Sequence, residues 1–87
     1  MNNATTLFRE TIASIPQDVE KQVDWSFAIA DKIAARLKEL GLSQKDFALM
    51  VGKTQAEVSR WLSGTHNFTI RTLAKISTVL GQDFIRV

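Results

Sequence analysis

The stretch Gln44–Ser63, QKDFALMVGKTQAEVSRWLS, constrains the fold more than any other part of this chain. Ser43, just before it, can cap a helix, with Asp46 three residues later in capping-box position. Gly52 then ends that helix, because glycine accepts the left-handed backbone of a C-cap at little cost. A second capping box, TQAE, starts the next helix. The stretch therefore predicts two short helices joined by a tight glycine turn.

Apolar residues follow helical spacing on one side of each of these helices. We expect the first helix to bury Phe47, Ala48 and Val51, and the second to bury Val58, Trp61 and Leu62. The rest of the second helix and its end carry Gln55, Ala56, Ser59, Arg60 and Ser63. Each helix thus has one face for a core, and the second keeps a largely polar face outside it.

This arrangement resembles the helix-turn-helix of the lambda-repressor and Cro family, also called Xre-like. The family has a bulky apolar residue, a small residue that lets the helices touch, a turn glycine and two apolar anchors. This chain has Phe47, Ala48, Gly52, Val58 and Trp61 at those positions. Lys53 departs from the pattern, because the family usually has an apolar residue there, so we expect it to face solvent or a phosphate. Residues 59–87 are particularly similar to antitoxins of the HigA type, so that the resemblance covers roughly the last 60 residues.

Helical patterns also occupy the rest of the chain, since it has one proline and four glycines, and the glycines fall where helices would end. An apolar stripe in Trp25–Leu40 predicts a helix that buries Phe27, Ala30, Ile33, Ala34, Leu37 and Leu40. Thr69 can cap a later helix that ends at Gly81. That helix is expected to turn Ile70, Leu73, Ile76 and Leu80 inward. Residues 82–87 follow as a short extended segment.

The amino-terminal part gives weaker signals. Thr6–Ile15 predicts a weak first helix, and Pro16 lies in the first turn of a second segment, for which Ser14 and Gln17 offer a capping box. We therefore expect an all-α, lambda-repressor-like fold with five or more short helices. Residues 1–23 form an amino-terminal helical extension, residues 24–87 form the helix-turn-helix domain, and the two make one compact unit.

Composition narrows the class of protein. Eighty-seven residues that are 45% hydrophobic suffice for one small core if the elements are helical or the chain dimerises. The absence of cysteine excludes disulfides and thiolate metal sites. No apolar signal or transmembrane stretch is present, so we expect a cytoplasmic bacterial protein. A net charge of +2 permits nucleic-acid binding, and from Lys53 onward five basic residues stand against two acids.

The resemblance implies that the second motif helix enters the major groove of DNA. By position in the family's motif, the base-reading candidates are Thr54, Gln55, Ala56, Ser59 and Arg60. Arg60 suits guanine O6 and N7, Gln55 suits adenine N6 and N7, and the methyl of Ala56 or Thr54 suits the thymine methyl. The candidates for phosphate contacts are Ser43, Gln44, Lys53, His66, Asn67, Thr69 and Arg71.

Each of these assignments has a structural alternative. The polar face of the second helix can simply be solvated, and Glu57 is better suited to capping than to base reading. Trp25 and Trp61 stand at helical spacing among aliphatic residues, so we expect core anchors rather than platforms for base stacking. His66 is the one histidine and has no cysteine beside it, so neither a metal site nor a cofactor is expected.

These patterns predict a sequence-specific DNA-binding regulator, either a lone repressor or the antitoxin of a toxin–antitoxin pair. Its expected partners are double-stranded DNA with an inverted repeat, a second copy of the chain and, for an antitoxin, a toxin. In the antitoxin interpretation, residues 1–23 either cover the core or receive the toxin. We expect the dimer contact to come from the tail, through Phe84 and Ile85, or from the amino-terminal helices. The alternative is a protein-interaction module without specific DNA recognition. An enzyme is disfavoured because the chain has no tyrosine, cysteine or glycine-rich phosphate loop.

Overall fold

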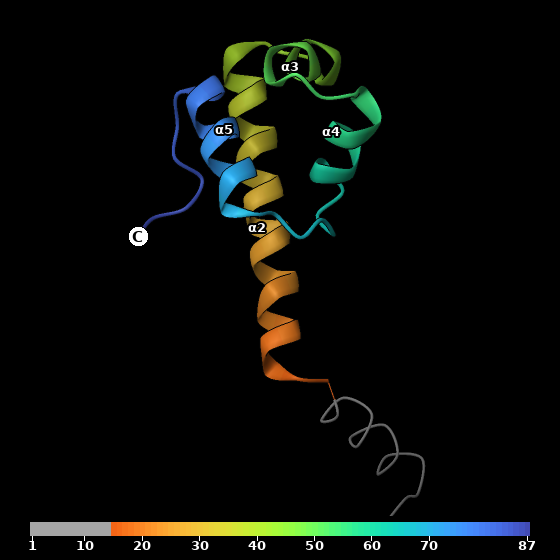
Figure 1. Ribbon diagram of the computed structural model, residues 1–87, viewed down its shortest axis with the longest axis vertical. Helices are drawn as coiled ribbons and strands as arrows, with labels where there is room; N and C mark the ends of the chain where they lie inside the picture. The colour runs from red at the N-terminus through yellow and green to blue at the C-terminus, as the bar shows by residue number, and fades with distance from the viewer. Residues whose placement is uncertain (1–14) are drawn as a thin grey trace, which may run out of the picture.

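The computed structural model describes residues 15–87, which form four helices and no strand (Figure 1). The helices are α2 (Gln17–Leu40), α3 (Gln44–Val51), α4 (Gln55–Leu62) and α5 (Ile70–Leu80). The all-α prediction is confirmed, whereas five or more helices are not found within these residues. The helix expected at Thr6–Ile15 lies outside them, except for Ile15, which forms a bend before α2.

Helix α2 is longer than the sequence predicts. It starts at Gln17 and not at Trp25, and Pro16 stands at the N-cap position instead of in the first turn. No side chain makes a capping hydrogen bond at Pro16, and the predicted capping box includes Ser14, which lies outside the described residues. Because no glycine or proline interrupts residues 17–40, the helix continues without a break through residues 23 and 24.

The two capping boxes of the motif are confirmed. Ser43 Oγ accepts a hydrogen bond from the Asp46 N–H at 3.0 Å, and Asp46 Oδ2 accepts one from the Ser43 N–H at 3.1 Å. At the start of α4, Thr54 Oγ1 accepts from the Glu57 N–H at 3.1 Å, and Glu57 Oε2 accepts from the Thr54 N–H at 3.2 Å. Both motif helices therefore begin where local side-chain chemistry satisfies their free amides.

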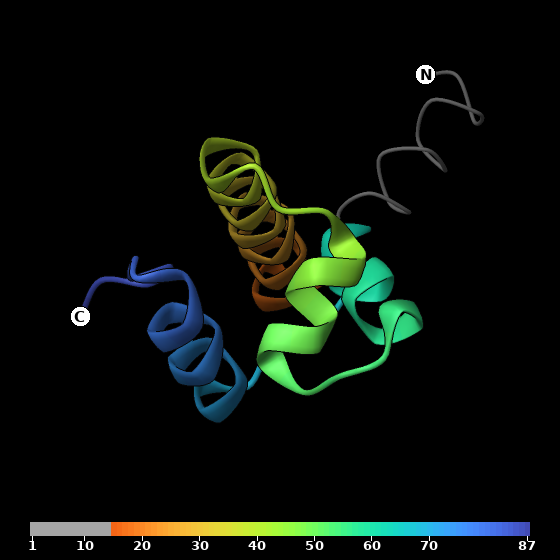
Figure 2. The same cartoon turned by 90° about the horizontal axis from the view of Figure 1, so that it is seen from above.

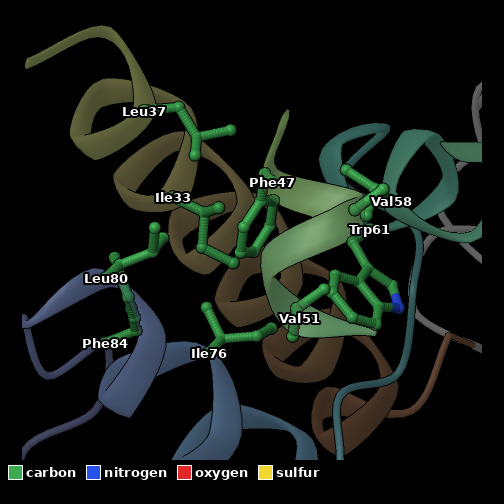
Figure 3. Close-up of a cluster of buried hydrophobic side chains, with 10 residues drawn as sticks. Ile33, Leu37, Phe47, Val51, Val58, Trp61, Ile76, Leu80 and Phe84 are labelled. Carbon is green, nitrogen blue, oxygen red and sulfur yellow. The ribbon is translucent and has the colours of Figure 1, made fainter. Parts of the chain in front are cut away.

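The core lies where α3 crosses between α4 and α5, with α2 packed against α4 (Figure 2). Its buried members are Ile33, Leu37, Phe47, Ala48, Val51, Val58, Trp61, Ile76, Leu80 and Phe84 (Figure 3). Phe47 and Trp61 meet edge to face, with ring centroids 6.0 Å apart. The burial predicted for the motif is confirmed for every residue except Leu62, which is half-buried.

The buried face of α2 is narrower than the sequence predicts. It consists of Ser26, Ala30, Ile33 and Leu37. Phe27, Ala34 and Leu40 were expected inside but are exposed, because they lie beside this line of contact. Trp25 is also not a core anchor, since it is 64% exposed.

Helix α5 begins at the predicted cap and ends at the predicted glycine. Thr69 Oγ1 accepts a hydrogen bond from the Thr72 N–H, and Gly81 closes the helix in the left-handed conformation. Leu73, Ile76 and Leu80 are buried as expected. Ile70 was expected to face inward but is 70% exposed, because it is the first residue of the helix, at the margin of the core.

The carboxyl-terminal tail returns to the core. Phe84 is only 2% exposed and packs within the core cluster, so it is not free to form a dimer contact as the sequence suggested. The end of α5 is also tied to α2, because Arg36 Nε donates a hydrogen bond to the Leu80 carbonyl at 2.9 Å. Residues 82–87 thus form an irregular segment with one buried anchor.

The loop between α4 and α5 is held against α2 by a contact at Gly64. Gly64 is buried, its φ is +88°, and a Cβ atom there would overlap the ring of Phe27. Glycine is required for both reasons. Phe27 therefore fixes the loop from outside the core.

We predict that Ala48→Leu lowers the free energy of unfolding by about 1–3 kcal/mol, because Ala48 is buried in the core cluster and a larger side chain there overpacks it. Ala35→Leu, at an exposed position of α2, is the matched control and leaves stability nearly unchanged. Chemical denaturation measures both. Equal stability of the two variants would show that α3 and α4 are not closely packed at Ala48.

A second prediction concerns Gly64. Gly52→Ala introduces left-handed strain alone, roughly 1–2 kcal/mol, since a Cβ there meets only the Lys75 amine at 3.8 Å. Gly64→Ala is expected to cost more in the same denaturation assay, because the Phe27 ring must also move. Adding Phe27→Ala to the Gly64→Ala protein should recover the difference. Equal losses at the two glycines would contradict this contact.

Candidate nucleic-acid interface

The turn between α3 and α4 is three residues long and tightly hydrogen-bonded. The Gly52 N–H donates to the Ala48 carbonyl, and so does the Lys53 N–H, at 3.0 Å. Gly52 takes φ +72°, the left-handed value that glycine adopts easily. Two short helices joined in this way have the geometry of a helix-turn-helix, in which the second helix is presented to a ligand.

Helix α4 separates a buried side from an exposed side. Val58 and Trp61 enter the core, whereas the exposed side carries Gln55, Ala56, Ser59 and Arg60. The structure therefore brings four of the five base-reading candidates onto one surface. Thr54, the fifth, stands exposed at the N-cap, where its hydroxyl oxygen accepts from the Glu57 N–H. The start of α4 is thus exposed and can enter a DNA major groove, which is about 12 Å wide.

The candidates for phosphate contacts lie in the segments that border α4 on both sides. Ser43 and Gln44 begin α3, Lys53 lies in the turn, and His66, Asn67, Thr69 and Arg71 follow α4. All are exposed except His66, which is half-buried. Lys53 and His66 line one hollow together with Arg60, whereas Asn67 and Arg71 are not part of its lining.

The sequence did not single out Thr72, although this residue also lines the hollow. Its position in the first turn of α5 gives a weak signal, because its hydroxyl pairs with that of the helix cap, Thr69, at 2.9 Å. A capping pattern alone does not say whether such a hydroxyl also faces a site shared with another helix. Thr72 becomes a candidate only because the folded chain brings the start of α5 to the same hollow as residues of α4.

The charges near the motif are largely uncompensated. Within residues 15–87, the one ion pair joins Arg36 and Glu39 in α2, so Lys53 and Arg60 have no acidic partner within 4.0 Å. The hydrogen bond from the Ser43 amide lowers the pKa of the Asp46 carboxyl below its usual value, which keeps the cap of α3 ionised. The described acids near α4 thus serve as helix caps, and its cations stay available.

No group of three His, Cys, Asp or Glu residues that could hold a metal ion is found in residues 15–87. Over the same residues, no helix has both the length and the apolar composition needed to cross a membrane.

Comparison with known proteins agrees with this geometry. The sequence profile of a family described as helix-turn-helix matches residues 33–85, more than half of the chain, from the second half of α2 into the tail. Searches of curated proteins and of solved structures each found no significant match. The chain therefore belongs to the lambda-repressor type of helix-turn-helix family and carries a DNA-binding domain.

Proposed function

We propose that this protein is a sequence-specific transcriptional repressor that places α4 in the major groove of its operator. The observation that carries the proposal is the two-sided character of α4: Val58 and Trp61 fix the helix from inside, and polar or small side chains face outward. A major groove admits one α-helix, and the donor and acceptor pattern of each base pair is unique there. We place this protein in the bacterial cytoplasm, at the nucleoid when it is bound.

Base reading is assigned to the start and middle of α4. Gln55 is suited to paired hydrogen bonds with adenine N6 and N7, and the methyl groups of Ala56 or Thr54 are suited to the thymine methyl. Ser59, one turn after Gln55, can donate to or accept from either kind of base edge. All four are exposed, which supports this assignment over a purely structural role.

Phosphate contacts hold the helix in register. The first residues of α3 and α5 offer free backbone N–H groups as well as the side chains of Gln44 and Arg71. Ser43 and Thr69 accept hydrogen bonds from amides of their own helices and keep hydroxyl oxygens at the surface, while Asn67 lies in the loop between α4 and α5. Such contacts supply affinity that depends on salt but carry no sequence information.

A second copy of the chain is proposed as a partner. One recognition helix reads only a few base pairs, so a symmetric dimer on an inverted repeat, with half-sites about 34–36 Å apart, gives useful specificity. Since Phe84 lies in the core, we assign the dimer contact to the part of α2 before Ser26, named here the α2 arm (residues 17–25). Val19 and Val23 continue the line of buried residues onto this arm and are 45% and 44% exposed.

The α2 arm also supports the antitoxin hypothesis as a second candidate function. An exposed apolar stripe next to a DNA-binding domain fits a protein partner, and residues 59–87 resemble HigA-type antitoxins. In that case a toxin occupies the arm, assisted by residues 1–16. A protein-interaction module without DNA recognition remains the alternative, and no catalytic role, metal or cofactor is assigned.

Selection from a random pool of DNA duplexes tests the function. We expect the wild type to enrich one sequence with twofold symmetry. Gln55→Ala should weaken binding to it by about 1–3 kcal/mol and relax the preference at one adenine in each half-site. Gln82→Ala, a half-buried glutamine of the tail outside both α4 and the α2 arm, is the control and should change neither affinity nor preference. Failure of the wild type to enrich any sequence would exclude a sequence-specific regulator.

Mass measurement tests the assembly. We expect two protomers for each operator, and with about 6–10 phosphates contacted, log affinity should fall with log salt at a slope of roughly −5 to −9. Val23→Glu should give a folded monomer, because Val23 lies outside the core and a buried charge opposes the contact. Gln17→Glu changes the charge equally on the side of the arm opposite to Val19 and Val23 and should remain dimeric. If the Val23→Glu protein is still a dimer, the dimer contact does not lie on the α2 arm.

A further inference from the structure

A small hollow beside α4 gathers polar side chains from four different segments. Its volume is about 210 Å³, and it is lined by Lys53, Glu57, Arg60, Trp61, His66 and Thr72. These residues belong to the turn before α4, to α4 itself, to the loop after it and to α5. The hollow is smaller than the roughly 300–1,000 Å³ of typical small-molecule pockets. Its size and lining therefore suit a compact polar group.

The lining of the hollow carries more positive than negative charge. Lys53 and Arg60 form no ion pair within residues 15–87. Glu57 is the only acid in the lining, and its carboxylate already accepts the hydrogen bond from the Thr54 N–H. Glu57 keeps its negative charge while it caps α4, so the lining carries two cations against one carboxylate, and an anion would compensate the excess positive charge. The electrostatics thus favour an anionic ligand.

His66 is held in the hollow by aromatic neighbours. Its ring meets Phe68 edge to face, with centroids 4.9 Å apart and planes at 85°, and its centroid lies 6.3 Å from that of Trp61. Trp61 is in turn anchored in the core, as Figure 3 shows. The imidazole is therefore positioned before any ligand arrives, so ordering it on binding costs little conformational entropy.

Thr72 adds a hydroxyl donor. The Thr69 hydroxyl donates to Thr72 Oγ1 at 2.9 Å, and Thr69 Oγ1 accepts from the Thr72 N–H at 3.1 Å. Because Thr72 Oγ1 acts as the acceptor of this pair, its own hydrogen is free to donate to a ligand. The hollow thus combines an ammonium, a guanidinium, an imidazole and a hydroxyl, the donor types that proteins use to contact phosphate oxygens.

We infer that this hollow holds one phosphate of the DNA backbone, and that Arg60 grips this phosphate and does not read a guanine. The inference rests on the proposed function and deepens it. A guanine edge is neutral and would leave the excess positive charge of the hollow uncompensated, whereas a phosphate carries the opposite charge and matches the planar fork of a guanidinium. Arg60 then fixes the register of α4, and base reading stays with Thr54, Gln55, Ala56 and Ser59.

DNA selection and salt dependence together test this role. Arg60→Ala should enrich the same sequence as the wild type, because no base contact is removed. Its affinity should fall by a similar factor on the enriched duplex and on a scrambled one, and its salt slope should be about 0.9 shallower. The loss caused by the substitution should then be roughly threefold to fourfold greater at 50 mM than at 200 mM salt.

Three variants complete the experiment. Lys53→Ala should behave as Arg60→Ala does, and Arg60→Lys should regain most of the salt slope, since it restores the charge without the fork. Lys32→Ala removes an exposed cation of α2 outside the hollow and should leave the slope unchanged. Far-ultraviolet circular dichroism checks that each variant is folded.

The outcomes separate the inference from the function. If Arg60→Ala relaxes the preference at one base pair and Arg60→Lys does not restore it, Arg60 reads a base, so the inference is wrong while the regulator stands. An unchanged salt slope in Arg60→Ala would likewise show that Arg60 does not contact a phosphate. If the wild type binds no duplex at all, both the proposed function and the inference that rests on it are wrong.

Discussion

The edge-to-face contact between Phe47 and Trp61 is the interaction on which the rest of the domain depends. It joins the two motif helices across the Gly52 turn, and the small side chain of Ala48 permits the close approach. The other side of the indole lies near His66 and Phe68, with centroids 6.3 and 6.4 Å away. One buried ring therefore orients both the exposed face of α4 and the loop that borders it.

Local signals in the sequence predicted the motif well. The two capping boxes, the turn glycine and the burial of Phe47, Val58 and Trp61 depend on residues within a few positions of one another, so a single sequence specifies them. Burial along α2 depends instead on which side the other helices cover. Trp25 has helical spacing and aliphatic neighbours, yet it is exposed because it lies off the line of Ser26, Ala30, Ile33 and Leu37. Phe84 is buried because the tail folds back, which spacing does not reveal.

In the candidate site, too, local sequence predicts some features and the packing of distant segments sets the others. Position in the motif was enough to select Gln55, Ala56 and Ser59, since helical periodicity alone places them opposite the core. Sequence position could not show that Lys53, Arg60 and His66 converge, because they come from a turn, a helix and a loop whose arrangement the core sets. The proposed role of Arg60 changes for this reason, from a reader of bases to a group that positions the DNA backbone.

Backbone amide chemical shifts, recorded before and after addition of the selected DNA duplex, test the central claim most directly. If α4 enters the major groove, the largest changes will fall on Gln55, Ala56 and Ser59 and on the turn before them, with smaller changes at the start of α3. The amides in the buried half of α2, around Ile33, will change little. Large changes confined to α2 and the tail, with the α4 signals unmoved, would contradict the account.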